Sequence, residues 1–270
     1  MSVTDTKHGG IQVRVLQLKD LRAAGAVVAT SFQREGFTRH TLDLSTARRR
    51  ERFSRAGELG LLLYHYQGQL VLTARQGQDL TGVTIVKLPG AKPIVPWYRR
   101  VGAVVQRLPG LIGLSRYVRW RRMLKLRSAV KPPDELPKPY YTLEILAVSP
   151  DFQGQGIGRL LLTHMHTHCD QDGQAAGIYL MTGDEHNTRI YRRFGYEVVA
   201  ARQGGSFTVW HMFRPHPARD AEAVFAARRE AAPEQSPARW RKLTLPLLGV
   251  AGTLIGLALL WRFLCSRDES

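Results

Sequence analysis

The sequence predicts an α/β (α+β) domain, with one mixed sheet flanked by helices, followed by an apolar C-terminal helix. Three observations support this prediction. Predicted strands and helices are interspersed along most of the chain, a glycine-rich stretch joins a strand to a helix at residues 149–158, and residues 243–261 carry no charge. Interspersed elements of both kinds are typical of a sheet and helices around one core rather than of separate domains.

The first half of the chain begins with a strand. Apolar and polar residues alternate over 11–16, and 18–32 then has the apolar spacing of a helix. Residues 46–66 indicate an arginine-rich helix. Two β-prone runs, 70–74 and 80–87, flank a turn-forming tripeptide and predict a hairpin.

The second half repeats strands and helices up to the end of the sheet. In chain order these are a strand at 140–148, a helix at 156–172, a strand at 177–181, a helix at 187–194, and strands at 197–201 and 207–212. We therefore place one domain at 1–214. A linker rich in Ala, Arg, Glu and Pro follows at 215–242.

Residues 89–139 form a predicted basic insertion within this domain. The stretch is bounded by prolines and contains many arginines among apolar and aromatic residues. It fits a lid over a substrate site, a helix in a membrane interface, or ordinary packing. We expect a lid or packing rather than an interface helix.

Charge and cysteine content narrow the classes of ligand. The net charge of +17 and the pI near 10.5 suit nucleic acid, anionic lipid or the phosphates of a coenzyme. Cys169 and Cys265 are too few and too far apart to indicate a disulfide framework or a zinc site. His164, His166 and His168 alternate within a predicted helix and so point to different sides. We predict no metal site.

Three glycines follow the strand that ends at Val148. Gly154, Gly156 and Gly158 lead from a proline-containing turn into a helix. Backbone N–H groups at a helix N-terminus attract anions such as a pyrophosphate. The G-x-G-x-x-G spacing of dinucleotide-binding proteins and the lysine of a phosphate-binding P-loop are both absent. A tight turn without a ligand is the alternative.

Two motifs resemble a known family. Residues 148–158 read VSPDFQGQGIG and match the Q/R-x-x-G-x-G/A coenzyme A loop of the GNAT N-acetyltransferases, and residues 187–196 read NTRIYRRFGY and match that superfamily's N-x-x-x-Y-x-x-x-G-F/Y turn. The resemblance covers about 140–212. It implies a mixed, mostly antiparallel sheet that splays open where the coenzyme enters. It also implies acetyl-CoA as acyl donor and direct acetyl transfer to a primary amine in a ternary complex.

Within the superfamily, the chain most resembles the puromycin N-acetyltransferase-like branch, which implies a small-molecule amine. The resemblance also assigns the coenzyme-binding residues. The strand supplies backbone groups for the pantetheine arm, and the loop supplies N–H groups for the pyrophosphate. These residues are Leu146, Ala147, Val148, Gln153, Gly154, Gln155, Gly156, Ile157, Gly158 and Arg159.

Acetyl transfer to an amine requires a proton for the departing thiolate and a neutral amine nucleophile. Tyr191 matches the family's motif tyrosine and is the candidate acid, with simple packing as the alternative. Glu144 shares a strand face with Leu146 and Val148 by alternation and is the candidate base, with an ion pair or a water relay as alternatives. Asn187 lies four residues before Tyr191; it binds the coenzyme arm or caps its helix.

The apolar segment 243–261 has the length of a membrane-spanning helix. Basic residues before it favour a cytoplasmic domain, no secretory signal begins the chain, and a short tail follows at 262–270. We expect a single-pass membrane protein with its catalytic domain in the cytoplasm. A buried or dimerising helix is the alternative, and Gly252 and Gly256 could pack two copies as a homodimer.

Other functions remain open. The chain could be a non-catalytic acyl-CoA-binding sensor, a protein-lysine or N-terminal acetyltransferase at the membrane, or a basic lipid-surface binder. Nucleic acid is disfavoured, because no aromatic-rich RNA-binding motif accompanies the basic insertion.

Overall fold

The structure is a computed structural model and describes residues 6–8, 10–33, 35–111, 126, 128–204 and 207–219. Within this part, eight strands form one sheet in the order β1-β2-β3-β4-β5-β6-β8-β7. The bounds are β1 Thr6–His8, β2 Ile11–Val15, β3 Leu70–Gln76, β4 Asp79–Lys87, β5 Tyr141–Val148, β6 Gly177–Thr182, β7 Glu197–Gln203 and β8 Thr208–Pro215. Among these eight described strands, only β5 and β6 pair in parallel. The mixed, mostly antiparallel sheet is confirmed.

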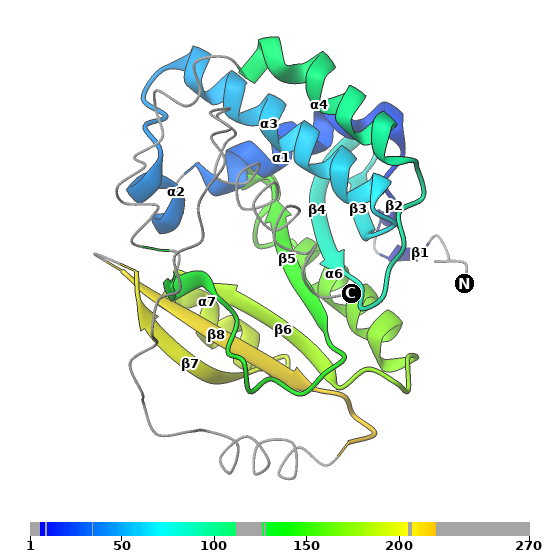
Figure 1. Ribbon diagram of the computed structural model, residues 1–270, viewed down its shortest axis with the longest axis vertical. Helices are drawn as coiled ribbons and strands as arrows, with labels where there is room; N and C mark the ends of the chain where they lie inside the picture. Colours follow the sequence, from blue (N-terminus) through cyan, green and yellow to red (C-terminus); the bar gives the residue numbers. More distant parts are fainter. Residues whose placement is uncertain are drawn as a thin grey trace.

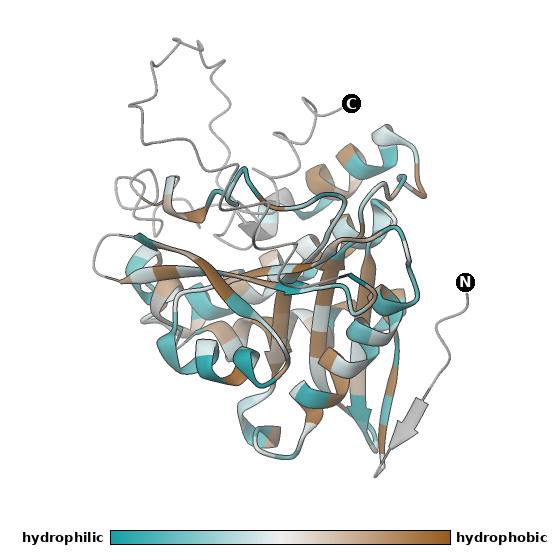
Figure 2. Ribbon diagram, turned by 90° about the horizontal axis from the view of Figure 1, so that it is seen from below, coloured by the Kyte–Doolittle hydropathy of each residue, from teal (hydrophilic) through white to brown (hydrophobic). Residues whose placement is uncertain are grey.

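Helices cover both faces of the sheet (Figure 1). The helix bounds are α1 Leu21–Phe32, α2 Gly36–Thr41, α3 Ala47–Tyr66, α4 Trp97–Leu111, α6 Ile157–Asp170 and α7 Glu185–Arg192. Alternate residues of the strands point to opposite faces of the sheet and belong to two hydrophobic clusters. Residues such as Val71 and Ile85 pack with α1 and α3, whereas Leu72 and Val86 pack with α6. The strands at the middle of the sheet are strongly hydrophobic in Figure 2.

Glycines set two close helix contacts. At Gly82 in β4, an added Cβ would lie 2.8 Å from Ile157 Cγ2 and 2.9 Å from Leu161 Cδ1. An added Cβ at Gly25 in α1 would lie 2.9 Å from the backbone oxygen of Ser54 in α3. The first contact seats the beginning of α6 directly on the sheet, and the second lets α1 and α3 cross backbone to backbone.

The sheet splays open between β5 and β6. The two strands pair only through Tyr141–Ile178, Thr142–Tyr179 and Leu143–Leu180. Beyond Leu143, β5 pairs with β4, whereas β6 continues beside β8. Figure 1 shows the two halves of the sheet turning away from each other at this point. A gap at the carboxyl ends of parallel strands is a common ligand-binding position in α/β folds.

Several predicted elements differ in detail. Strand β1 and helix α2 were not predicted, because each has only three to six residues and gives little periodic signal. Helix α7 begins at Glu185 rather than at the predicted residue 187, because Asp184 caps it by accepting from the His186 N–H at 2.8 Å. The alternative that Asn187 caps this helix is therefore wrong.

The predicted insertion at 89–139 is partly a layer of the domain. Helix α4 packs on α3, with Val104 against Ala56, Leu59 and Leu63. At the other end of the insertion, Leu126, Ala129 and Leu136 are buried. The described parts of this segment therefore pack as elements of the fold.

The predicted membrane span at 243–261, the linker beyond residue 219 and the proposed dimer contact at Gly252 and Gly256 lie outside the described residues. In the part of the chain that the structure describes, no helix combines the length and the apolar character needed to cross a membrane.

Candidate functional site

The open edge of β5 exposes main-chain groups to the gap. The Ser149 N–H donates to the Thr81 carbonyl at 2.8 Å. Since successive residues of a strand direct their peptide groups to opposite sides, the groups of Ala147 are directed toward β4 and those of Leu146 and Val148 toward the gap. Of the three predicted coenzyme-binding residues on this strand, Leu146 and Val148 thus have suitably directed backbone groups.

The Val148 carbonyl already has two donors. It accepts from Ser31 Oγ of α1 at 2.8 Å and from Gln153 Nε2 at 3.2 Å. The motif glutamine therefore closes its own loop back onto the strand. Ser31, which sequence reasoning missed, ties the end of α1 to the same point from 117 residues away.

The loop after β5 requires glycine at two positions. Gly154 has φ +79° and Gly156 has φ +81°, and an added Cβ at either would meet nothing within 4 Å. The requirement is conformational, because only glycine adopts the left-handed region without strain. The loop residues Gln153, Gly154, Gln155 and Gly156 are all exposed. This loop can present its backbone to a ligand.

Helix α6 begins without a side-chain cap. Gly156 is its N-cap residue and has no side chain to bond the first turn. The first helical hydrogen bond runs from the Leu160 N–H to the Gly156 carbonyl at 3.0 Å. The preceding N–H groups, those of Ile157, Gly158 and Arg159, are the ones that an anion at a helix N-terminus would accept from. The exposed side chain of Arg159 stands in the same turn.

The structure brings the second motif to the same core. Tyr191 at the end of α7 packs against the cluster that also holds Leu146, Val148 and Leu160 as partly buried neighbours. Burial raises the pKa of Tyr191 to about 12. The phenol is therefore protonated at neutral pH, as a general acid must be.

Tyr191 rests on a buried support. Its ring meets that of Tyr196 edge to face, with centroids 5.7 Å apart. The Tyr196 hydroxyl lies 3.0 Å from His166 Nε2 of α6. Burial lowers the pKa of His166 to about 4, so this imidazole is neutral. The tyrosine of the motif is thus held by α6, the helix that follows the glycine loop.

Asn187 lies on α7 one turn before Tyr191. Its Nδ2 is 3.5 Å from Oγ1 of Thr182, the last residue of β6. This weak contact orients the amide beside the end of β6 and is compatible with its predicted role at the coenzyme arm.

Comparisons with known proteins address this half of the chain. A model of the acetyltransferase (GNAT) domain matches residues 126–198, which include both motifs. This segment is therefore similar to a GNAT acetyltransferase domain. A mycothiol acetyltransferase from Propionibacterium freudenreichii subsp. shermanii is 35% identical over 75 residues, 27% of this chain and 24% of that protein. The chain thus spans about a quarter of the length of the curated relative that it matches.

A solved structure shows a similar fold. A crystal structure described as histone acetyltransferase HPA2 and related acetyltransferase, from Corynebacterium glutamicum, has a TM-score of 0.54 at 16% identity and covers 77% of this chain and 97% of its own. The PaiA N-acetyltransferase from Thermoplasma acidophilum, in complex with coenzyme A, has a TM-score of 0.46 at 14% identity over 76% and 98%. The first shows a similar overall fold, and the second is too distant to carry an argument.

Two carboxylates are candidates for the proton acceptor. Glu144 occupies the bulge where the β4–β5 register shifts, and it is half-buried like Leu146 and Val148, as strand alternation predicted. The second, Glu35, was missed. It lies between α1 and α2, and its Oε1 is 3.3 Å from where a Cβ on Gly183 would stand, directly after β6.

Glu35 lies where the start of α2 meets the end of β6. Its carboxylate caps α2 by accepting from the Thr38 N–H at 3.0 Å. Burial raises its pKa, and nearby Asp184 raises it further, while hydrogen bonds from Thr38 and Phe37 oppose the shift. A carboxylate whose pKa is raised in this way is a candidate proton acceptor. Phe37 and Phe207 stack edge to face beside it, with centroids 6.0 Å apart.

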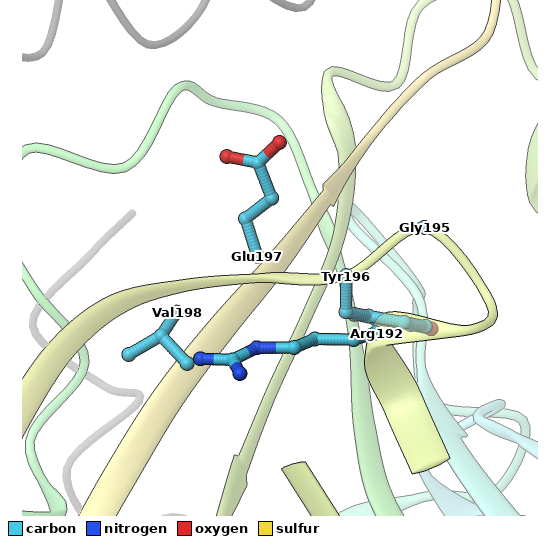
Figure 3. A pocket seen from close by; sticks show the side chains of 5 residues that line it. All are labelled: Arg192, Gly195, Tyr196, Glu197 and Val198. Carbon is cyan, nitrogen blue, oxygen red and sulfur yellow. The ribbon is translucent and has the colours of Figure 1, made fainter. Parts of the chain in front are cut away.

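A hollow of about 410 Å³ lies at the start of the outer strand β7. Figure 3 shows the Arg192 side chain reaching toward Val198, with the Glu197 carboxylate pointing away from both. Its lining includes Tyr196, which supports Tyr191, but none of the loop residues 153–158. The chemistry described above therefore favours the gap between β5 and β6 as the site. Among the described residues, no group of three His, Cys, Asp or Glu side chains is placed to hold a metal.

Proposed function

We propose that this protein is an acetyl-CoA-dependent N-acetyltransferase that acts on a primary amine of a small molecule. The observation that carries the proposal is the convergence of the glycine loop, the open edge of β5 and Tyr191 on one core cluster. The GNAT match over residues 126–198 supports it independently.

The binding step follows from the backbone. Leu146 and Val148 bind the coenzyme arm through main-chain groups on the open strand edge. The first turn of α6 holds the pyrophosphate by its N–H groups, with Arg159 adding positive charge. Bound acetyl-CoA supplies the thioester carbonyl that the amine attacks.

The proton steps are assigned to side chains of the gap. Tyr191 donates its phenolic proton toward the departing sulfur. A carboxylate, Glu144 or Glu35, accepts the proton of the attacking amine. General acid and base catalysis contribute about 10²–10⁴ in rate each.

A small amine as acceptor is consistent with the charged and aromatic groups near the end of β6. Glu35 and Asp184 supply negative charge that attracts an ammonium group, and Phe37 and Phe207 supply an aromatic wall. The resemblance to the puromycin N-acetyltransferase-like branch points the same way. A protein-lysine or N-terminal acetyltransferase and a non-catalytic acyl-CoA sensor are the competing functions.

A panel of acceptors tests this proposal. The full-length protein in detergent is incubated with acetyl-CoA and with aromatic primary amines, aliphatic polyamines, a lysine peptide or a free N-terminal peptide, and thiol release is followed. The proposal predicts turnover with a small amine that Glu35→Gln reduces. Turnover with peptides alone would identify a protein acetyltransferase, and binding without any turnover would identify a sensor.

We also infer that residues 243–261 tether the domain to a membrane, with the domain in the cytoplasm. The uncharged segment and the basic residues before it support this inference. Flotation of the full-length chain with vesicles after alkaline extraction tests it. A chain that alkali releases from vesicles would contradict a spanning helix.

A further inference from the structure

Helix α4 carries a continuous apolar stripe on its outer face. Trp97, Tyr98, Val101 and Val105 are 51–68% exposed, and Ile94 just before the helix is 59% exposed. These five residues account for most of the large exposed hydrophobic side chains in the described chain, where the others are Val15, Leu18 and Ile190. An exposed apolar patch of this kind marks an interaction surface.

The stripe occupies one side of the helix. With about 100° per residue, Trp97, Val101, Val105 and Tyr98 fall within an arc of about 100°. Ala103 and Val104 lie outside this arc and face the interior, against the core and α3. Figure 1 shows α4 as the outermost helix of its layer. The fold therefore uses one face of α4 and leaves the other to solvent.

The charge around the stripe has one sign. From Leu80 to Pro133 the sequence contains no Asp or Glu, whereas it contains twelve Lys and Arg residues. Lys92 and Arg99, beside the stripe, are both exposed. An apolar face with Trp and Tyr beside basic residues is the pattern of a helix lying in the headgroup region of an anionic bilayer.

We propose that the outer face of α4 docks on an anionic membrane surface and holds the domain against the bilayer. A second copy of the chain fits less well, because a two-fold contact would place this basic segment opposite itself. A nucleic acid fits less well also, because the centre of the stripe is formed by Val101 and Val105, whose side chains do not stack on bases.

The proposed tether brings this face within reach of a membrane. The stretch 220–242 separates the described chain from the apolar segment. It spans at most about 80 Å when extended, while a domain of this size is roughly 45 Å across. The inference rests on the tether only as the source of a nearby bilayer, and it is independent of acetyl transfer.

A solvent-sensitive fluorophore on α4 tests the docking. The full-length chain carries Cys265→Ser and Val101→Cys, and the new cysteine is labelled with NBD. The remaining cysteine, Cys169, is protected from labelling because it is buried and because burial raises its pKa to about 12. The matched control is Thr163→Cys, an exposed position on α6 across the sheet. Each protein is placed in nanodiscs at one chain per disc, made of phosphatidylcholine with or without phosphatidylserine.

Docking predicts that the emission of NBD at position 101 shifts to shorter wavelength in the anionic discs and is quenched by lipid spin labels. The emission of NBD at position 163 should show neither the shift nor the quenching. The shift should be reversed by 1 M salt, where screening acts within about 3 Å. Arg99→Gln should weaken the docking about fivefold. Water-like emission at position 101 in anionic discs would overturn the proposal, as would a shift seen only at two chains per disc. Flotation reports the tether separately.

Discussion

Replacing Gly156 by alanine should weaken acetyl-CoA binding by about tenfold to a hundredfold. Gly156 has φ +81°, and an added Cβ would meet no atom within 4 Å, so backbone strain is the whole local cost. Holding a residue with a Cβ in this region costs about 1–2 kcal/mol. For a domain of this size, that lowers the Tm by about 2–8 °C.

The chain can escape this strain by changing φ at position 156, which rotates the first N–H groups of α6 away from the ligand. A hydrogen bond to a charged group contributes about 1.5–3 kcal/mol. The loss of one such bond gives the predicted change in affinity. Isothermal titration calorimetry measures the binding and a thermal melt measures the strain.

Gly10 provides the matched control. It also has φ +81° with nothing within 4 Å of an added Cβ, and it lies in the turn between β1 and β2. Gly10→Ala should lower the Tm by a similar amount and leave acetyl-CoA affinity unchanged. Our reasoning is refuted if Gly156→Ala melts like Gly10→Ala and binds acetyl-CoA as tightly as the wild-type protein does.

Three further predictions concern chemistry, pH and packing. Tyr191→Phe should lower kcat by about 10²–10⁴ with an unchanged acetyl-CoA Kd; full activity would remove Tyr191 as the acid. Burial lowers the pKa of His211 to about 4, so the fold holds it neutral, and its contribution to stability is lost as pH falls from about 6.5 toward 4. Between pH 7 and pH 5, the free energy of unfolding measured by thermal melts should fall by on the order of 2 kcal/mol more in the wild-type protein than in His211→Gln. An equal fall in both proteins would contradict this. Gly25→Ala should destabilise the protein by about 1–3 kcal/mol in urea unfolding, because the added Cβ meets the backbone of Ser54. The control Gly102→Ala, where an added Cβ meets nothing within 4 Å, should be neutral or stabilising by up to about 1 kcal/mol. Equal effects of the two substitutions would contradict the close crossing of α1 and α3.

The sequence predicted the features whose signal is local. The long strands and helices have clear periodicity, and the glycine loop lies between β5 and α6 as expected. The half-buried state of Glu144, Leu146 and Val148 also followed from strand alternation, even though a bulge interrupts the register at Glu144.

The features that depend on distant contacts were not predictable from one sequence. The bond from Ser31 to the Val148 carbonyl joins residues 117 positions apart. Glu35 reads as a surface residue in a short loop, and only the fold places it beside Gly183. The alternative that Asn187 caps α7 was wrong because Asp and Asn are both frequent caps, and the sequence alone does not say that the helix begins after Asp184. The roles of Tyr191 and Glu144 stay predictions.

Helix α4 shows what the sequence left open about the insertion. Its arginines and aromatic residues suggested a lid or packing, and the described parts do pack, but sequence spacing alone does not say which face of an amphipathic helix is covered. The packing of Ala103 and Val104 on the interior supplies that information and leaves the apolar residues from Trp97 to Val105 outside.

The most direct test of the central claim is a calorimetric titration of acetyl-CoA into the full-length protein beside its Gly156→Glu variant. We predict saturable one-site binding to the wild-type protein and none to the variant, because a carboxylate in the loop repels the pyrophosphate. Absence of binding to the wild-type protein, or equal binding to both, would contradict a coenzyme site at the start of α6.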